Sequence, residues 1–155
     1  MRKLLRHTFL ATALAAVGVL PAMAQTSSLH LGPRVGYNFD AEEFTLGGQL
    51  SVPVSSRLEF YPSADVHFVE VGSLWTLNAD LKYRFSGESM NWFYAGAGLG
   101  FRMRSFNDND NTDTGFNMFF GAESLRGRVH PFGEARVTLS DGSMFMLVGG
   151  LNFTI

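Results

Sequence analysis

Cysteine is absent from this 155-residue chain, and that absence sets the first limits on it. Without a thiol the protein forms no disulfide and carries no lipid anchor of the lipoprotein type. Long apolar runs are absent as well after residue 24, where no stretch reaches the roughly 20 residues that a transmembrane helix needs. Any crossing of a membrane by the rest of the chain must therefore be made by strands.

The N-terminus has the three parts of a secretory signal peptide. A basic segment precedes an apolar stretch over residues 8–20, and a small-x-small pattern then ends at Ala24. We expect cleavage between Ala24 and Gln25, which makes 1–24 the signal peptide and 25–155 a single domain. The alternative is a retained membrane helix, but thirteen residues span only about 20 Å of a hydrocarbon core that is about 30 Å thick.

Positive charge is scarce in the remaining chain. Cleavage removes three of the twelve Lys and Arg residues and leaves fourteen Asp and Glu, which gives a net charge of −5. This balance gives no reason to expect a nucleic-acid partner. Hydrophobic residues nevertheless make up 46% of the whole chain, and its fifteen phenylalanines are many for a small soluble protein. This apolar mass must face something other than water.

From residue 29 onward, bulky apolar side chains alternate with small or charged ones. Successive side chains of a strand point to opposite faces, so each segment has one apolar and one polar face. The clearest segment sets Trp75 and Leu77 against Asp80 and Lys82. Such segments cover about 29–39, 43–54, 58–70, 74–85, 92–104, 116–125, 131–139 and 144–155. They predict an all-β fold, an eight-stranded antiparallel up-and-down transmembrane β-barrel.

Two architectures satisfy eight amphipathic strands, and they differ in where the apolar face points. A secreted lipocalin-like barrel turns it inward around a ligand, whereas a membrane barrel turns it outward to lipid. The lumen of an eight-stranded barrel holds only side chains or one small ligand, too little room for so many Phe, Leu and Trp. The opposite face carries the glycines and nearly all charges within strands, and a Lys or Arg facing lipid at mid-depth costs roughly 2–4 kcal/mol. We therefore expect the apolar face to point outward.

Four short motifs make 29–155 similar to a known family. They lie at the opening of the first strand, in the fifth, in the seventh and at the C-terminus: Gly32-Pro33-Arg34-Val35-Gly36-Tyr37, Phe93-Tyr94-Ala95-Gly96-Ala97-Gly98-Leu99-Gly100, Pro131-Phe132-Gly133-Glu134-Ala135-Arg136 and Gly150-Leu151-Asn152-Phe153-Thr154-Ile155. With them the chain resembles the small outer-membrane β-barrel family that includes OmpX-like and OmpA-like eight-stranded domains. The resemblance implies an integral protein of the cell outer membrane, surrounded by its lipid, while functions within the family vary.

The last residues resemble the C-terminal signal that the barrel-assembly machinery recognises in this family. Leu151, Phe153 and Ile155 share one face of the last strand. Family members usually end on an aromatic residue, whereas this chain ends on Ile155 with Phe153 two positions earlier. The resemblance implies that the barrel-assembly machinery is a partner during biogenesis.

Charges of both signs on the inward face predict a network of ion pairs inside the barrel. Buried charges are very costly unless they are paired and hydrogen-bonded. Open aqueous channels also need many more strands, so we expect a charge-plugged lumen rather than a general pore. The residues assigned to this network are Arg34, Glu43, Glu59, Asp65, His67, Asp80, Lys82, Arg84, Arg102, Arg104, Glu123, Glu134 and Arg136.

An enzymatic role finds little support in the sequence. His67 lies two positions from Asp65 and suggests an acid–base pair, but no serine or cysteine nucleophile is identifiable beside it. His130, at a predicted turn, is expected to be solvated. Lipid A deacylases of this barrel size carry Ser, His and Glu on their lipid-facing surface, and no His or Glu suits that role here. We expect neither catalysis nor a cofactor; the alternative is a small barrel enzyme that acts on lipid or peptide.

One predicted loop is long. Eight strands place both termini at one end, in the periplasm of such barrels, so the opposite set of turns lies outside the cell. Residues 105–115 form the longest of these and offer the main surface for an extracellular partner. Asp108, Asp110 and Asp113 in this loop suggest a weak Ca²⁺ site, although an EF-hand pattern is not met. The sequence thus predicts a structural or surface-interaction protein.

Overall fold

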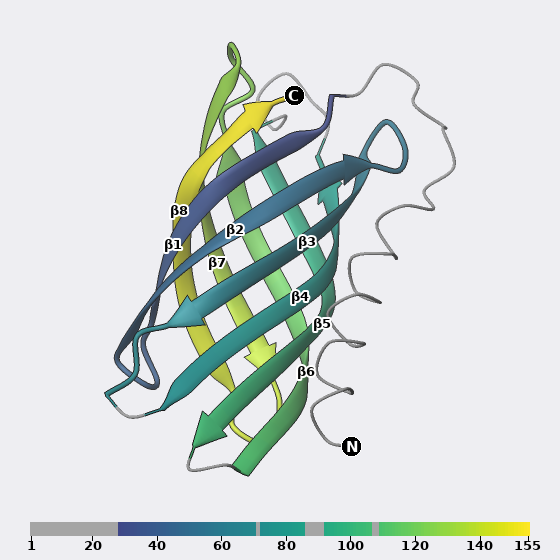
Figure 1. Cartoon of the computed structure of the whole chain (residues 1–155). Coiled ribbons are helices and arrows are strands. Elements are labelled where there is room, and N and C mark those ends of the chain that lie inside the picture. The colour runs from purple at the N-terminus through teal and green to yellow at the C-terminus, as the bar shows by residue number, and fades with distance from the viewer. Residues whose placement is uncertain (1–27, 71, 86–91, 107–108) are drawn as a thin grey trace, which may run out of the picture.

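The computed structural model describes residues 28–70, 72–85, 92–106 and 109–155. Within them, eight antiparallel strands form one closed barrel, in which each strand pairs with its sequence neighbours and β8 returns to β1 (Figure 1). The strands are β1 His30–Asn38, β2 Glu43–Pro53, β3 Leu58–His67, β4 Ser73–Arg84, β5 Phe93–Phe106, β6 Asn109–Glu123, β7 Val129–Leu139 and β8 Met144–Thr154. The predicted eight-stranded up-and-down barrel is therefore confirmed.

The predicted signal peptide and its cleavage position lie outside the described residues, as do 71, 86–91 and 107–108. Among the described residues, no helix is long and apolar enough to cross a membrane. The C-terminus lies at one end of the barrel and the β5–β6 hairpin lies at the other (Figure 1).

Polar and apolar side chains are distributed inside out relative to a soluble protein. Every second residue of β4 is buried, and the residues between them face outward, as Trp75 and Leu77 do at 47% and 39% exposure. Among the described residues, twenty buried side chains are polar or charged and only eight are hydrophobic. Soluble proteins bury their apolar residues instead. The structure therefore confirms the prediction that the apolar face points outward.

Three aromatic side chains fill the middle of the lumen. Tyr61, Tyr94 and Phe119 are at most 5% exposed and form one cluster. Their rings need glycine opposite them, because a Cβ on Gly96 would lie 2.2 Å from Phe119 Cζ and one on Gly121 would lie 2.5 Å from Tyr94 Cζ. Phe119 interrupts the apolar alternation of its segment in the sequence because it points inward, where small neighbours leave room for it.

The prediction of a long loop over residues 105–115 is wrong. Strand β5 continues to Phe106 and β6 begins at Asn109, with Met103 opposite Thr112 in register. The sequence lacks an apolar outward stripe at the start of β6, where the exposed residues 111–114 are Asn, Thr, Asp and Thr. β-branched residues suit a strand without needing lipid against them. The segment is therefore a hairpin that extends two strands.

Candidate functional site

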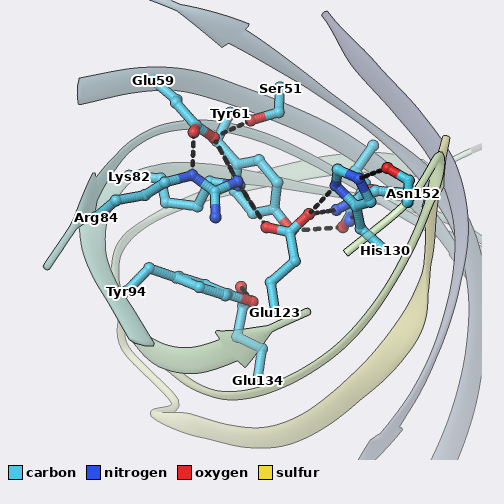
Figure 2. Close-up of polar contacts among 12 residues, drawn as sticks. Ser51, Glu59, Tyr61, Lys82, Arg84, Tyr94, Glu123, His130, Glu134 and Asn152 are labelled. Carbon is cyan, nitrogen blue, oxygen red and sulfur yellow. Dashed lines mark hydrogen bonds and ion pairs between the residues drawn. The ribbon is translucent and has the colours of Figure 1, made fainter. Parts of the chain in front are cut away.

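The lumen near the C-terminal end holds a cluster of two cations and two carboxylates from strands β3, β4 and β6 (Figure 2). Lys82 Nζ lies 2.8 Å from Glu59 Oε2 and 3.4 Å from Glu123 Oε2. Arg84 Nη2 donates to Glu123 Oε2 at 2.7 Å, while Arg84 Nε donates to Glu59. The Ser51 hydroxyl also donates to Glu59. Each carboxylate thus meets both cations.

Aromatic rings complete the surroundings of Lys82, which is fully buried. Its Nζ lies 4.3 Å from the centroid of the Tyr61 ring and 5.1 Å from that of Tyr94. A cation over an aromatic face is attracted by the ring quadrupole. Two carboxylates and two rings therefore replace the water that this ammonium group loses.

Arg136 forms the centre of a second cluster at mid-barrel. Its Nη1 donates to Asp80 Oδ2 at 2.6 Å and its Nε donates to Glu134 Oε1 at 3.0 Å. Tyr94 donates its hydroxyl proton to Glu134 Oε2 at 3.1 Å, and Asn117 Nδ2 donates to Asp80 Oδ1 at 2.9 Å. Arg136 also lies over the Phe119 ring, with Cζ 4.5 Å from its centroid.

Arg34 and Asp65 form a third, two-pronged pair. Arg34 Nε donates to Asp65 Oδ1 at 2.7 Å, and Nη2 donates to Oδ2 at 2.5 Å. Two parallel hydrogen bonds of this kind are the strongest arrangement for a guanidinium and a carboxylate. Both side chains are buried, at 2% and 3% exposure. Asp65 therefore pairs with Arg34 and not with His67.

His67 contacts Thr76, a residue that is not predicted as its partner. Its Nε2 lies 2.8 Å from Thr76 Oγ1, and its Nδ1 lies 3.5 Å from Glu43 Oε2 without hydrogen-bond geometry. The sequence gives no signal that Thr76 contacts His67. The residue directly opposite Thr76 in the β3–β4 register is Asp65, not His67. A carboxylate, an imidazole and a hydroxyl are thus adjacent, but the carboxylate does not orient the ring.

Two predicted network residues do not join these clusters. The side chain of Arg104 is exposed, and Arg102 is half-buried and donates to Met144 Sδ at 3.2 Å. Neither forms an ion pair with a side chain that the structure describes. Because β5 runs beyond the enclosed part of the lumen, the inward parity of Arg104 no longer implies burial.

Two further predictions, a solvated His130 and a calcium loop, concern the ends of the barrel. His130 is buried at 5% exposure, not solvated, because β7 begins at Val129 and turns it inward. Asp113 lies exposed in β6 and accepts from Asn111 Nδ2 at 3.1 Å. Of its companions in the predicted calcium loop, Asp110 lies within β6 and Asp108 lies outside the described residues. Residues 109–113 of the expected loop thus belong to a strand.

The C-terminal motif lies on the outer face of β8. Leu151, Phe153 and Ile155 are 40%, 43% and 69% exposed. Asn152 between them points into the lumen and is 1% exposed. The motif therefore presents an apolar edge outward while its polar member belongs to the interior.

A small cavity lies inside the barrel. A cavity of about 10 Å³ lies toward the β5–β6 end, lined by residues that include Thr76, Arg102 and Thr138. A single water molecule needs about that much room. This cavity is therefore too small for a ligand larger than water.

A closed eight-stranded barrel with an apolar outside and a charged inside is the fold of the small outer-membrane β-barrels. The N-terminal β-barrel domain of Pseudomonas aeruginosa OprF is similar, with a TM-score of 0.70 and 16% identity over 83% of this chain and 97% of that domain. Neisserial surface protein A (NspA) follows at 0.58 and 13%, over 83% and 95%. Designed transmembrane β-barrels match at 0.54 and 15%, over 85% and 98%. No family model and no curated protein matches the sequence.

Proposed function

We propose that this protein is an integral outer-membrane barrel with a structural or surface-interaction role and a closed lumen. The observation that carries the proposal is the inverted distribution of side chains, with charges buried and large apolar residues outside. Phe44 and Val35 are 66% and 58% exposed, an arrangement that water would disfavour and lipid favours. The structural similarity to outer-membrane barrels supports the same location.

The closed lumen is inferred from the three ion-paired clusters and the aromatic side chains between them. Ions would have to displace charges such as Lys82 and Arg136, which are held by two carboxylates each. Breaking a buried pair by removing one partner leaves an uncompensated charge and is strongly unfavourable. A plug of this kind suits a protein that is anchored in the membrane without conducting.

The surface role is assigned to the end of the barrel that carries the β5–β6 hairpin. This hairpin is the longest of the molecule, and its exposed residues Asn111, Thr112 and Asp113 are hydrophilic. It replaces the loop predicted over 105–115 as the site for an extracellular partner. The opposite end carries the C-terminal motif, on which assembly by the barrel-assembly machinery is proposed to depend.

We assign no enzymatic activity to the Glu43, His67 and Thr76 arrangement. A general base must be oriented by a hydrogen bond, and the carboxylate here makes none to the imidazole. Alanine at His67 and at Glu134 is therefore expected to leave lipid A unchanged by mass analysis. A change in lipid A that depends on either residue would instead favour the barrel-enzyme alternative.

The location is tested by fractionation combined with heat-modifiability. We expect the protein in the outer-membrane fraction, extracted only by detergent, with a faster-migrating folded form on gels that shifts when the sample is boiled. Recovery of the folded protein from a periplasmic extract without detergent would contradict the proposal and favour a secreted soluble barrel. A periplasmic soluble protein serves as the marker for leakage between fractions.

A further inference from the structure

Two histidines and a glutamate meet in the lumen near the C-terminal end. His30 begins β1, Glu123 ends β6 and His130 is the second residue of β7. One ligand atom from each lies within 4.8 Å of those of the other two. The rings of His30 and His130 stand edge to face with centroids 4.8 Å apart. This constellation is called the His30–Glu123–His130 site below, and of its members Glu123 also belongs to the ion-paired cluster around Lys82 and Arg84.

His130 presents a bare nitrogen to this site. Its Nε2 lies 3.0 Å from the carbonyl oxygen of Gly127, and since a carbonyl only accepts, the ring donates its proton there. The other nitrogen, Nδ1, then carries a lone pair in the neutral ring. It is buried and has no hydrogen-bond partner. Metal-binding histidines have this arrangement, in which one N–H is tied to a carbonyl and the other nitrogen is left for the metal.

Glu123 divides its two oxygens between different tasks. Oε2 accepts from Arg84 and lies beside Lys82, whereas Oε1 faces His130 with 3.9 Å between Oε1 and Nδ1. Oε1 also accepts from Asn152 Nδ2 at 2.7 Å, which leaves it capacity for one further partner (Figure 2). The carboxylate is thus fixed by its neighbours and directs one oxygen to the histidines.

A hydrogen-bonded chain holds Glu123 in place from the far side. The Tyr61 hydroxyl donates to Gln49 Oε1 at 2.7 Å. Gln49 Nε2 in turn donates to Asn152 Oδ1 at 2.7 Å, which leaves the amide of Asn152 free to donate to Glu123. Outer partners of this kind orient a ligand before a metal arrives.

Charge does not oppose a cation here. Lys82 and Arg84 are matched by Glu59 and Glu123. Over all ion pairs of Lys and Arg among the described lumen residues, five carboxylates face four cations. His30 is only half-buried, so the site is accessible from the end of the barrel.

We propose that His30, Glu123 and His130 bind one divalent transition-metal ion, with Zn²⁺ as the best fit. Two imidazoles and a carboxylate are ligands of zinc, whereas Ca²⁺ and Mg²⁺ prefer oxygen alone. Zinc bonds of about 2.0–2.2 Å bring ligand atoms to about 3.4 Å from one another. Side-chain rotations that close the present spacing complete the site, and water takes the fourth position. The ion joins β1, β6 and β7 at the end of the barrel where the C-terminus lies.

Zinc binding by the untagged protein, purified in detergent, tests the proposal. Competition with a chromophoric chelator is expected to give one site with micromolar or tighter affinity, and the Tm is expected to rise with zinc concentration. His30→Gln and His130→Gln should each weaken binding by about tenfold or more. His67→Gln is the matched control, since His67 is also a buried histidine but lies far along β3, and it should bind zinc like the wild type.

X-ray absorption of the zinc-loaded wild type gives a second measurement that needs no variant. Scattering from two imidazoles and light oxygen ligands is expected. No binding at micromolar zinc, an absorption spectrum without imidazole, or equal affinity of His130→Gln, His30→Gln and wild type would each overturn the proposal. Heat-modifiability verifies that each variant is folded before its affinity is compared.

Discussion

At the scale of single residues, the lumen is a set of charges whose water has been replaced by specific partners. Arg34 makes this plain, because its guanidinium is almost fully buried and its one ion-pair partner among the described residues is Asp65. Such pairs contribute little net stability when intact, yet removing one member strands the other. The interior is therefore sensitive to single substitutions.

Arg34→Met is expected to lower the free energy of unfolding by about 3–5 kcal/mol, because the Asp65 carboxylate is then buried without a cation. Denaturant titration in detergent or vesicles measures the change. The double variant Arg34→Met/Asp65→Leu should recover most of the loss. Arg57→Met, at an exposed turn, should change stability by less than about 0.5 kcal/mol. An Arg34→Met variant that is as stable as Arg57→Met would contradict the Arg34–Asp65 ion pair.

A second residue-scale prediction concerns the close approach of β4 and β5 at Gly98. A Cβ there would lie 2.3 Å from the carbonyl oxygen of Ala79 and 2.5 Å from Asp80 Cα, both backbone atoms. Gly98→Ala should therefore cost about 1–3 kcal/mol of folding free energy. Gly133→Ala is the control, since a Cβ on Gly133 meets no atom within 4 Å. Equal stability of the two variants would refute the close packing.

At the scale of elements, the sequence predicts faces better than ends or partners. Alternation alone places Asp65 and Lys82 inward, because parity along a strand decides the face. Parity does not choose partners, which depend on how far each strand is staggered around the closed barrel. Gln49 and Asn152, for example, are 103 positions apart and yet hydrogen-bonded.

For a related reason, the sequence does not predict that β5 and β6 extend through the segment expected to be a loop. Outside the apolar band a strand no longer needs an apolar stripe, so its pattern resembles that of a loop. The same extension explains why Arg104 is exposed although its parity is inward. His130 is the opposite case, since a strand that starts before it makes it a buried residue.

The extended hairpin is tested by a disulfide in a chain without cysteine. Met103 and Thr112 are direct partners in register and both are exposed, so Met103→Cys/Thr112→Cys should oxidise readily. Mass spectrometry of the folded protein measures the bond. Met103→Cys/Thr114→Cys, shifted by two residues on the same face, should remain largely reduced. Equal oxidation of both pairs would mean that the segment is a loop.

At the scale of the whole molecule, the proposed location in a membrane would cover the apolar outside of the barrel with hydrocarbon. Inside the barrel, the Lys and Arg residues of the three clusters are paired with carboxylates, and the proposed closed lumen depends on these pairs. The apolar outside and the charged inside together support the proposed location in lipid.

Planar bilayers test the closed lumen. The purified barrel is expected to give no stable conductance steps, because ion-paired clusters and aromatic side chains occupy the lumen along the proposed ion path. A general porin added afterwards to the same bilayer serves as the positive control. Large, long-lived steps before that addition would contradict the plug.

The outward direction of the apolar face is measured most directly by a spin label in lipid vesicles. Leu99 lies in the middle of β5 with its side chain 48% exposed, and Asp141 lies in the exposed turn between β7 and β8. A label at Leu99→Cys should collide with dissolved oxygen and be shielded from a water-soluble nickel chelate, while one at Asp141→Cys should show the reverse. A Leu99 label that meets the nickel chelate as freely as the Asp141 label would show that this face lies in water.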